Sequence, residues 1–151
     1  MVAPFRYVFV FIAFFLLLGV RSASAADAPY VQTPWNVVEA MFKMGSVGPN
    51  DFLIDLGSGD GRIVIAAAAK HGARGFGVEL DPNLVNTARR EAERQGLKDR
   101  VTFLADDLFF VDLSKATVIT VYMGEGVNLR LRPSLSVFAG VWLGFTPDFS
   151  A

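Results

Sequence analysis

The chain has 151 residues, of which 52% are hydrophobic, and its formal net charge is −1. This length allows at most one domain, and the near-neutral charge disfavours a nucleic-acid-binding surface. The only histidine, His71, gives no metal-ligating or triad constellation, so we predict no metal site and place His71 at a helix end as a surface capping residue. The absence of cysteine decides nothing about compartment, because an exported domain need not carry disulfides.

The N-terminus carries a targeting pattern. Tyr7 to Val20 is an unbroken apolar run, shorter than the about 20 residues that a membrane-spanning helix needs. Ala23-Ser24-Ala25 follows it with the small-residue spacing of a cleavage site. We interpret residues 1–25 as a cleaved export signal, with an uncleaved membrane anchor as the alternative. Both alternatives predict a protein that is exported to the periplasm or medium or is held at a membrane.

A linker and a helix precede the first strand of a domain that we place at residues 26–135. Residues 26–34 contain Pro29 and Pro34 and have the composition of a linker. Apolar residues recur at helical spacing over Trp35–Met44, and Gly45 ends the pattern. We predict a helix there, which forms either a layer of the core or a lid over a ligand.

The stretch from Asp51 to Gly61 reads D-F-L-I-D-L-G-S-G-D-G and organises the domain. Phe52–Leu56 is a short apolar run typical of a strand buried on both faces. The glycines that follow at alternate positions let the backbone turn sharply and leave no Cβ between its N–H groups and a ligand. Arg62–His71 is helix-like, and Gly72 is placed to cap it. Strand, glycine bend and helix together predict the ligand-binding corner of a doubly wound sheet.

The glycine spacing and one carboxylate indicate which ligand this corner takes. The pattern is G-x-G-x-G, whereas a dinucleotide fingerprint is G-x-G-x-x-G. Asp55 lies two residues upstream of the first glycine, where a carboxylate suits a cationic amino group and repels a pyrophosphate. The glycine spacing and Asp55 therefore favour S-adenosylmethionine over NAD. The alternative is a flexible turn that binds no ligand.

A second strand ends in another acidic residue. Gly75–Asp81 has strand character, and Glu79 follows Asp55 at close to the spacing of about 20 residues at which an acidic residue reaches ribose hydroxyls. Asp81 and Pro82 have the residue types of an N-cap and first turn. We predict a helix over residues 83–95 that is ended by Gly96.

Two further strands complete the recognisable sheet. Val101–Ala105 is followed by Asp106-Asp107, which either accept from the exocyclic amine of an adenine or simply form a turn. Ala116–Met123 is β-branched and apolar, as expected of a buried strand. The alternation of strands and helices predicts an α/β fold with a parallel sheet.

Four stretches, D-L-G-S-G-D-G-R-I, G-V-E-L-D-P, D-L-F-x-x-D-L-S-x-A-T-V and V-N-L-R-L-R-P, with Y-V-x-T-P upstream, together resemble a known family. They are similar to the small class I S-adenosylmethionine-dependent methyltransferases, which have a Rossmann-like sheet of seven strands. Within them the likeness is to protein-lysine methyltransferases of the archaeal broad-specificity and ATP-synthase c-subunit types, and more distantly to non-SET histone lysine methyltransferases. The resemblance covers Tyr30 to about Leu135.

The resemblance implies roles for individual residues. The expected cofactor-binding residues are Tyr30 and Thr33 in a segment that closes over the cofactor, Asp55, Gly57, Gly59 and Gly61 at its methionine part, Glu79 at the ribose and Asp107 by the adenine. The stretch from Tyr122 to Asn128 is expected to line the acceptor channel, with Tyr122 as the catalytic candidate that orients the acceptor amine.

The chain departs from the family pattern in two places. Relatives have a Leu-Leu-Pro-Glu-like stretch where this chain has Met123-Gly124-Glu125-Gly126, which predicts a more flexible acceptor wall. Residues 136–151 lack the G-T-R-V-V-S-H-type strand of relatives and form an atypical tail, as truncation or a frameshift would produce. We therefore expect an incomplete sheet in which the first four strands are present, the last strands are missing and the fourth strand lies at an edge.

The expected function is methyl transfer to a protein lysine. The absence of an N/D-P-P-Y motif disfavours nucleobase and glutamine-amide acceptors, and the charge disfavours nucleic acid, so a protein substrate is preferred over a small molecule. The alternatives are a remnant that binds the cofactor without transfer, a small-molecule methyltransferase and an NAD-dependent oxidoreductase. An exported enzyme would lack this cytosolic cofactor, a conflict that anchoring with the domain inside would resolve.

Overall fold

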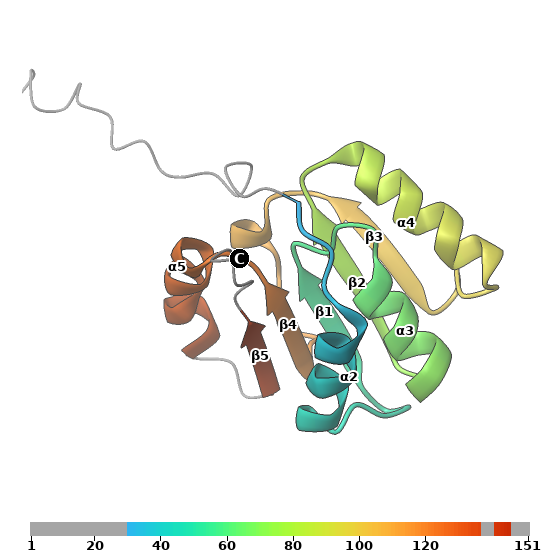
Figure 1. The fold of residues 1–151 in the computed structure, drawn as a ribbon, viewed down its shortest axis with the longest axis horizontal. Coiled ribbons are helices and arrows are strands. Elements are labelled where there is room, and N and C mark those ends of the chain that lie inside the picture. The colour runs from blue at the N-terminus through green and yellow to red at the C-terminus, as the bar shows by residue number, and fades with distance from the viewer. Residues whose placement is uncertain (1–29, 137–140, 146–151) are drawn as a thin grey trace, which may run out of the picture.

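The computed structural model describes residues 30–136, and the backbone of residues 141–145 (Figure 1). The predicted signal at residues 1–25 lies outside the described residues. Within the described ranges, no helix has the length and apolar character needed to cross a membrane.

The core of the fold is a five-stranded parallel sheet in the order β3-β2-β1-β4-β5. Buried apolar and β-branched residues fill its central strands, as parallel strands covered on both faces require. The predicted α/β, Rossmann-like fold is confirmed. The strands are β1 (Phe52–Leu56), β2 (Arg74–Glu79), β3 (Val101–Ala105), β4 (Val118–Tyr122) and β5 (Val141–Phe145).

Helices connect the strands, and local signals in the sequence set their ends. The Asp81 side chain accepts a hydrogen bond from the Asn83 N–H at 2.8 Å, and Pro82 occupies the first turn, as predicted. Gly72 has φ +72° and ends the helix over Arg62–His71. The described helices are α2 (Trp35–Met44), α3 (Arg62–His71), α4 (Pro82–Arg94), the 3₁₀ turn η2 (Leu108–Phe110) and α5 (Glu125–Ser136).

The sheet separates two apolar layers, which makes the fold doubly wound. On one face, α2, α3 and α4 pack against the sheet through residues such as Phe42, Val64 and Val85 (Figure 1). On the other face, α5 contributes Leu131 and Leu135, and Leu108 of η2 joins the same cluster. The helix α2 is therefore a layer of the core, while the segment that leads into it runs past the carboxyl end of β1.

Our expectation that β4 forms an edge of the sheet is wrong. Strand β4 does not lie at an edge, because β5 pairs with it in parallel from Val118↔Val141 to Tyr122↔Phe145. Helix α5 supplies the crossover connection that a parallel neighbour needs. The expected flexible Met123–Gly126 stretch is also half helical, because α5 begins at Glu125.

His71 lies at the end of α3 as expected and is partly exposed, but its ring also packs against the core. Its ring meets the Phe42 ring edge-on, with 4.9 Å between centroids, and its Nε2 atom is buried without a hydrogen-bond partner in the described structure. The end of α3 is closed instead by Gly72, whose N–H donates to the Ala68 carbonyl oxygen.

Candidate functional site

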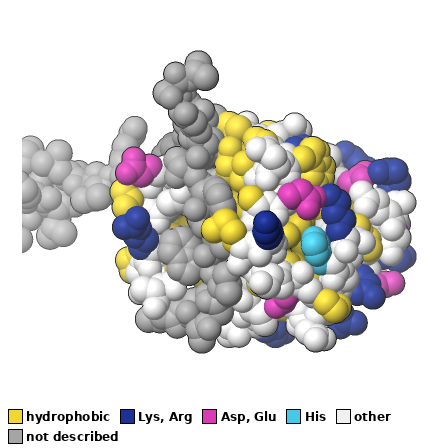
Figure 2. Space-filling view, turned by 60° about the horizontal axis from the view of Figure 1, so that its bottom comes forward, with side chains coloured by type: hydrophobic (Ala, Val, Ile, Leu, Met, Phe, Trp, Pro, Cys, Tyr) yellow, Lys and Arg dark blue, Asp and Glu magenta, His cyan; other side chains and the backbone are white. Residues whose placement is uncertain are grey.

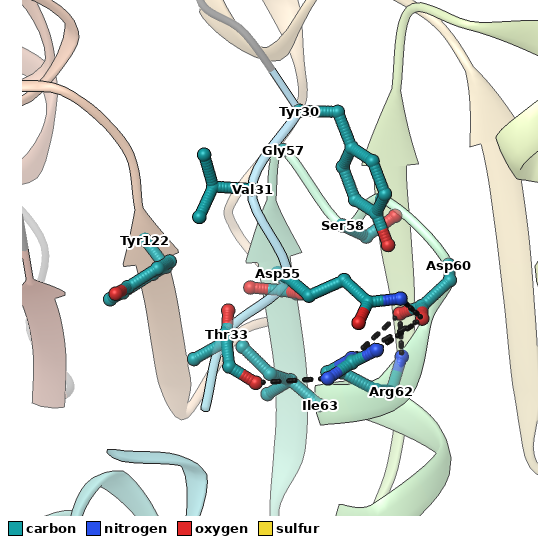
Figure 3. A pocket seen from close by; sticks show the side chains of 12 residues that line it. Tyr30, Val31, Thr33, Asp55, Gly57, Ser58, Asp60, Arg62, Ile63 and Tyr122 are labelled. Atoms are coloured by element: carbon teal, nitrogen blue, oxygen red, sulfur yellow. Dashed lines mark hydrogen bonds and ion pairs between the residues drawn. The ribbon is translucent and has the colours of Figure 1, made fainter. Parts of the chain in front are cut away.

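The predicted site residues come from strand ends that meet at one edge of the sheet. The parallel register aligns Leu56 with Val78 and with Val121, so β1, β2 and β4 end at the same level. At this edge lies a hollow of about 250 Å³, including its open mouth (Figure 3). Six of the nine predicted site residues line it: Tyr30, Thr33, Asp55, Gly57, Gly59 and Tyr122.

Asp55 is a buried carboxylate at the end of β1, with only 2% of its surface exposed. Its pKa is raised to about 7, mainly by burial; a hydrogen bond from the Thr120 hydroxyl opposes this shift, and the charges of Glu79 and Asp60 add to it. The Thr120 hydroxyl donates to Asp55 Oδ1 at 2.7 Å. The carboxylate therefore keeps acceptor capacity towards the hollow, in surroundings whose negative charge favours a cationic ligand group.

Four backbone N–H groups of the glycine bend already donate to acceptors within the protein. The N–H groups of Gly57 and Ser58 donate to the Val78 carbonyl oxygen at 2.9 and 2.8 Å. The Gly59 N–H donates to Glu79 Oε2 at 3.0 Å, and the Gly61 N–H donates to the Ser58 carbonyl oxygen. A pyrophosphate site needs such donors to be free for the ligand. The bend together with Asp55 therefore fits the amino-acid part of S-adenosylmethionine and does not fit a dinucleotide.

Side chains from two other segments cover the bend. Gly57 has φ +84°, and a Cβ built on it would lie 2.6 Å from the Met123 sulfur. A Cβ on Gly59 would overlap the Tyr30 ring. Both positions need glycine because neighbouring side chains approach the backbone this closely.

Gly61, Glu79 and Asp107, the remaining predicted residues, do not line the hollow. Gly61 faces α4 and β3, and a Cβ on it would lie 2.7 Å from Ala88 Cβ and from the Phe103 ring. Glu79 stands behind the bend, where its two oxygens accept from the N–H groups of Gly59 and Asp81. Asp107 caps η2 by accepting from the Phe109 N–H at 3.0 Å. Of the two roles that the sequence left open for it, adenine acceptor or turn-former, this contact is the turn-forming one.

Sequence reasoning missed the ion pair of Asp60 and Arg62 beside the bend. Arg62 Nη2 lies 2.7 Å from Asp60 Oδ2, and both residues line the hollow. Burial raises the pKa of Asp60, but the hydrogen bonds and charge of Arg62 outweigh it and hold that pKa below its usual value. The D-G-R sequence that follows the bend is the one local signal of this pair. Thr120 was missed as well, because it reaches Asp55 from the neighbouring strand β4.

The strand order, the glycine bend and the buried carboxylate at the end of the first strand define a class I S-adenosylmethionine-dependent methyltransferase. The family model for the ANTKMT methyltransferase domain matches residues 55–139, and the chain belongs to this family. This membership confirms the predicted enzyme class and cofactor.

Three relatives illustrate the similarity. A protein-lysine N-methyltransferase of Saccharolobus islandicus is 38% identical over 71% of this chain and 67% of its own length. The human lysine N-methyltransferase of the ATP-synthase c-subunit is 36% identical, again over 71% of this chain. The crystal structure of an RNA methyltransferase from Salinibacter ruber with S-adenosyl-L-homocysteine is 51% identical, with a TM-score of 0.69 and coverage of 74% of this chain and 71% of that chain. The chain spans only 45% of the human relative.

Proposed function

We propose that this chain transfers a methyl group from S-adenosylmethionine to a lysine amine of a protein. The observation that carries the proposal is the buried Asp55 carboxylate beside the glycine bend, in one hollow with Tyr122. The names of the archaeal and human relatives support lysine as the acceptor. The residues of the site have two tasks: they bind the cofactor, and they position the acceptor amine.

The first task of the site is to bind the cofactor, which supplies an electrophilic methyl group on a sulfonium. Asp55 would accept from its amino group, and Gly57 and Gly59 line the same hollow beside Asp55. Glu79 keeps one lone pair on each oxygen after its two backbone hydrogen bonds, so it remains our candidate for the ribose. Asp107, which is half-buried at the start of η2 shortly after β3, remains our candidate for the adenine.

The second task is to aim a neutral amine at the methyl group. A lysine with a pKa of about 10.4 in water loses its proton more easily in an apolar channel, so no dedicated general base is needed. Tyr122 ends β4, is partly buried and lines the same hollow as Asp55. Its hydroxyl is our candidate for orienting the amine, because in-line displacement depends mainly on such positioning.

The test is incubation of the full chain with methyl-labelled cofactor and a mixture of proteins, followed by amino-acid analysis of the label. We expect methylated lysine, and we expect Asp55→Asn to remove the labelling while leaving the fold intact. Tyr122→Phe should reduce the rate with little change in cofactor affinity. Label that persists in Asp55→Asn, or that appears on another amino acid, would contradict the proposal.

RNA is the second candidate acceptor, because the similar Salinibacter ruber protein is described as an RNA methyltransferase. On the face shown in Figure 2, basic and acidic side chains are interspersed, which favours a protein acceptor over RNA for that face. A parallel incubation with total RNA separates the two acceptors. Label in RNA, sensitive to ribonuclease and lost in Asp55→Asn, would replace lysine by a nucleotide as the acceptor.

A further inference from the structure

Arg62 connects three parts of the site. It is the first residue of α3, directly after the glycine bend. Its Nε and Nη2 atoms hold the Asp60 carboxylate at 3.0 and 2.7 Å, and its Nη1 donates to the Thr33 carbonyl oxygen at 3.1 Å. Its guanidinium carbon lies 5.4 Å from the centroid of the Trp35 ring (Figure 3 shows the carboxylate and carbonyl contacts).

The segment Tyr30–Thr33 depends on this residue and its partner. Among the described residues, the hydrogen bonds that join this segment to the bend end on Arg62 or Asp60: Thr33 accepts from Arg62, and the Gln32 amide donates to Asp60 at 3.5 Å. Burial, and next the charge of Asp60, raises the pKa of Tyr30, whose hydroxyl also faces Asp60. The ion pair is itself mostly buried, with side-chain exposures of 16% for Arg62 and 23% for Asp60.

The position of this segment decides the shape of the hollow. The Tyr30 ring covers Gly59, and Thr33 is 6% exposed in the lining that contains Asp55. A segment without its anchor would lose this arrangement, because neutral or weak contacts do not fix an extended chain of four residues against its backbone entropy.

We propose that Arg62 is a positioning residue for the cofactor: by anchoring Tyr30–Thr33 to the glycine bend, it sets cofactor affinity without contacting the reacting atoms. Each of its three guanidinium nitrogens already donates to Asp60 or Thr33. The inference rests on the cofactor part of the proposed function and is independent of the acceptor.

The sign of the effect separates positioning from simple electrostatics. Removing a positive charge beside Asp60 should strengthen the binding of a cationic ligand if Arg62 acted only through its charge. Loss of the anchor should weaken binding instead. Replacing Arg62 by lysine keeps the charge but loses the planar fork that serves Asp60 and Thr33 together, so lysine is not a conservative substitute here.

The experiment is calorimetric titration of the full chain with S-adenosylmethionine and with S-adenosyl-L-homocysteine. We expect Arg62→Met and Arg62→Lys each to raise Kd about tenfold or more, as befits lost hydrogen bonds between charged groups. The double variant Asp60→Asn with Arg62→Met should bind as weakly as Arg62→Met, because both lack the anchor. In turnover, KM for the cofactor should rise while kcat at saturation stays within about twofold.

Lys70→Met is the matched control. Lys70 also lies over the Trp35 ring, at 5.5 Å, and pairs with Glu39, but it does not line the hollow. Its Kd should equal that of the unchanged chain. Wild-type affinity in both Arg62 variants, tighter binding by Arg62→Met, or an equal loss in Lys70→Met would overturn the proposal.

Hydrogen exchange keeps the proposal testable if an Arg62 variant folds poorly. In the unchanged chain, S-adenosyl-L-homocysteine should slow exchange at residues 30–38 and 57–62 together, since the anchor joins these segments. Protection of the bend alone would contradict the inference. Neither the calorimetric titration nor hydrogen exchange uses an acceptor, so failure of the lysine assay leaves these two tests of Arg62 intact, and the reverse also holds.

Discussion

At the scale of single residues, Asp55 shows how burial prepares a group for its ligand. The ligand-free carboxyl has its pKa raised to about 7, mainly because burial disfavours its charged form. A cationic amino group placed beside it favours that charged form and lowers the pKa again. Binding of the cofactor therefore requires Asp55 to be deprotonated.

We predict that cofactor affinity falls with pH below about 7. Where Asp55 is protonated in the free protein, each unit of decrease in pH should raise Kd up to tenfold, because binding then releases one proton. The cofactor amino group, with a pKa of about 8 for an ordinary α-amino group, stays charged over this range. Calorimetry between pH 5.5 and 7 in buffers of different ionisation heat measures both Kd and the proton released. In Asp55→Asn, Kd should be weak and flat with pH, and the same slope in that variant would assign the proton to another group.

Single residues also mark where sequence reasoning succeeds and where it stops. Asp55 was predicted from a local pattern, a carboxylate that ends an apolar strand before glycines, and the structure places it in the hollow. The contact of Arg62 with the Thr33 carbonyl spans 29 positions and involves a backbone acceptor, which carries no residue-type signal. Gly61 satisfied the glycine pattern, yet its neighbours Ala88 and Phe103 could be identified only in three dimensions.

At the scale of elements, Gly61 determines how closely the start of α3 packs between α4 and β3. We predict that Gly61→Ala lowers the free energy of unfolding by about 2–5 kcal/mol, since it adds an unfavourable φ of +80° to overpacking against Ala88 and Phe103. Gly96→Ala is the control, because Gly96 has φ +70° and open space around its Cβ. It should cost only about 1–2 kcal/mol of backbone strain. Urea unfolding of both variants gives the difference, and equal costs would show that packing at Gly61 adds nothing.

Elements with strong local signals were predicted almost to the residue. The bounds of α2 and α3 agree with the sequence, because proline or glycine flanks each helix and its apolar spacing is regular. Strand β5 was not predicted, because its five residues, V-W-L-G-F, become a strand only by pairing with β4. Pairing partners are fixed by the whole sheet, so a short apolar run alone cannot identify them.

At the scale of the whole molecule, β5 completes the side of the sheet on which β4 would otherwise be exposed. Strand β4 carries Thr120 and Tyr122, so the stability of this side also supports Asp55 and the acceptor end of the site. A chain that stops after Ser136 keeps α5 but leaves the β5-facing N–H and C=O groups of β4 unpaired. Such an open central edge is a template for intermolecular pairing.

We therefore predict that a chain ending at Ser136 melts well below the full chain, by about 4–8 °C for each kcal/mol lost, and associates at micromolar concentration. Thermal unfolding followed by circular dichroism, together with sedimentation velocity, measures both effects. As a control, removal of residues 146–151 leaves the β4–β5 pairing in place and should change neither. Cofactor affinity should fall in parallel with stability in the shorter chain, because Thr120 holds Asp55 from the strand that loses its neighbour. A stable monomer with unchanged affinity would mean that β5 contributes nothing to the sheet in solution, and that β4 is held by β1 and α5 alone.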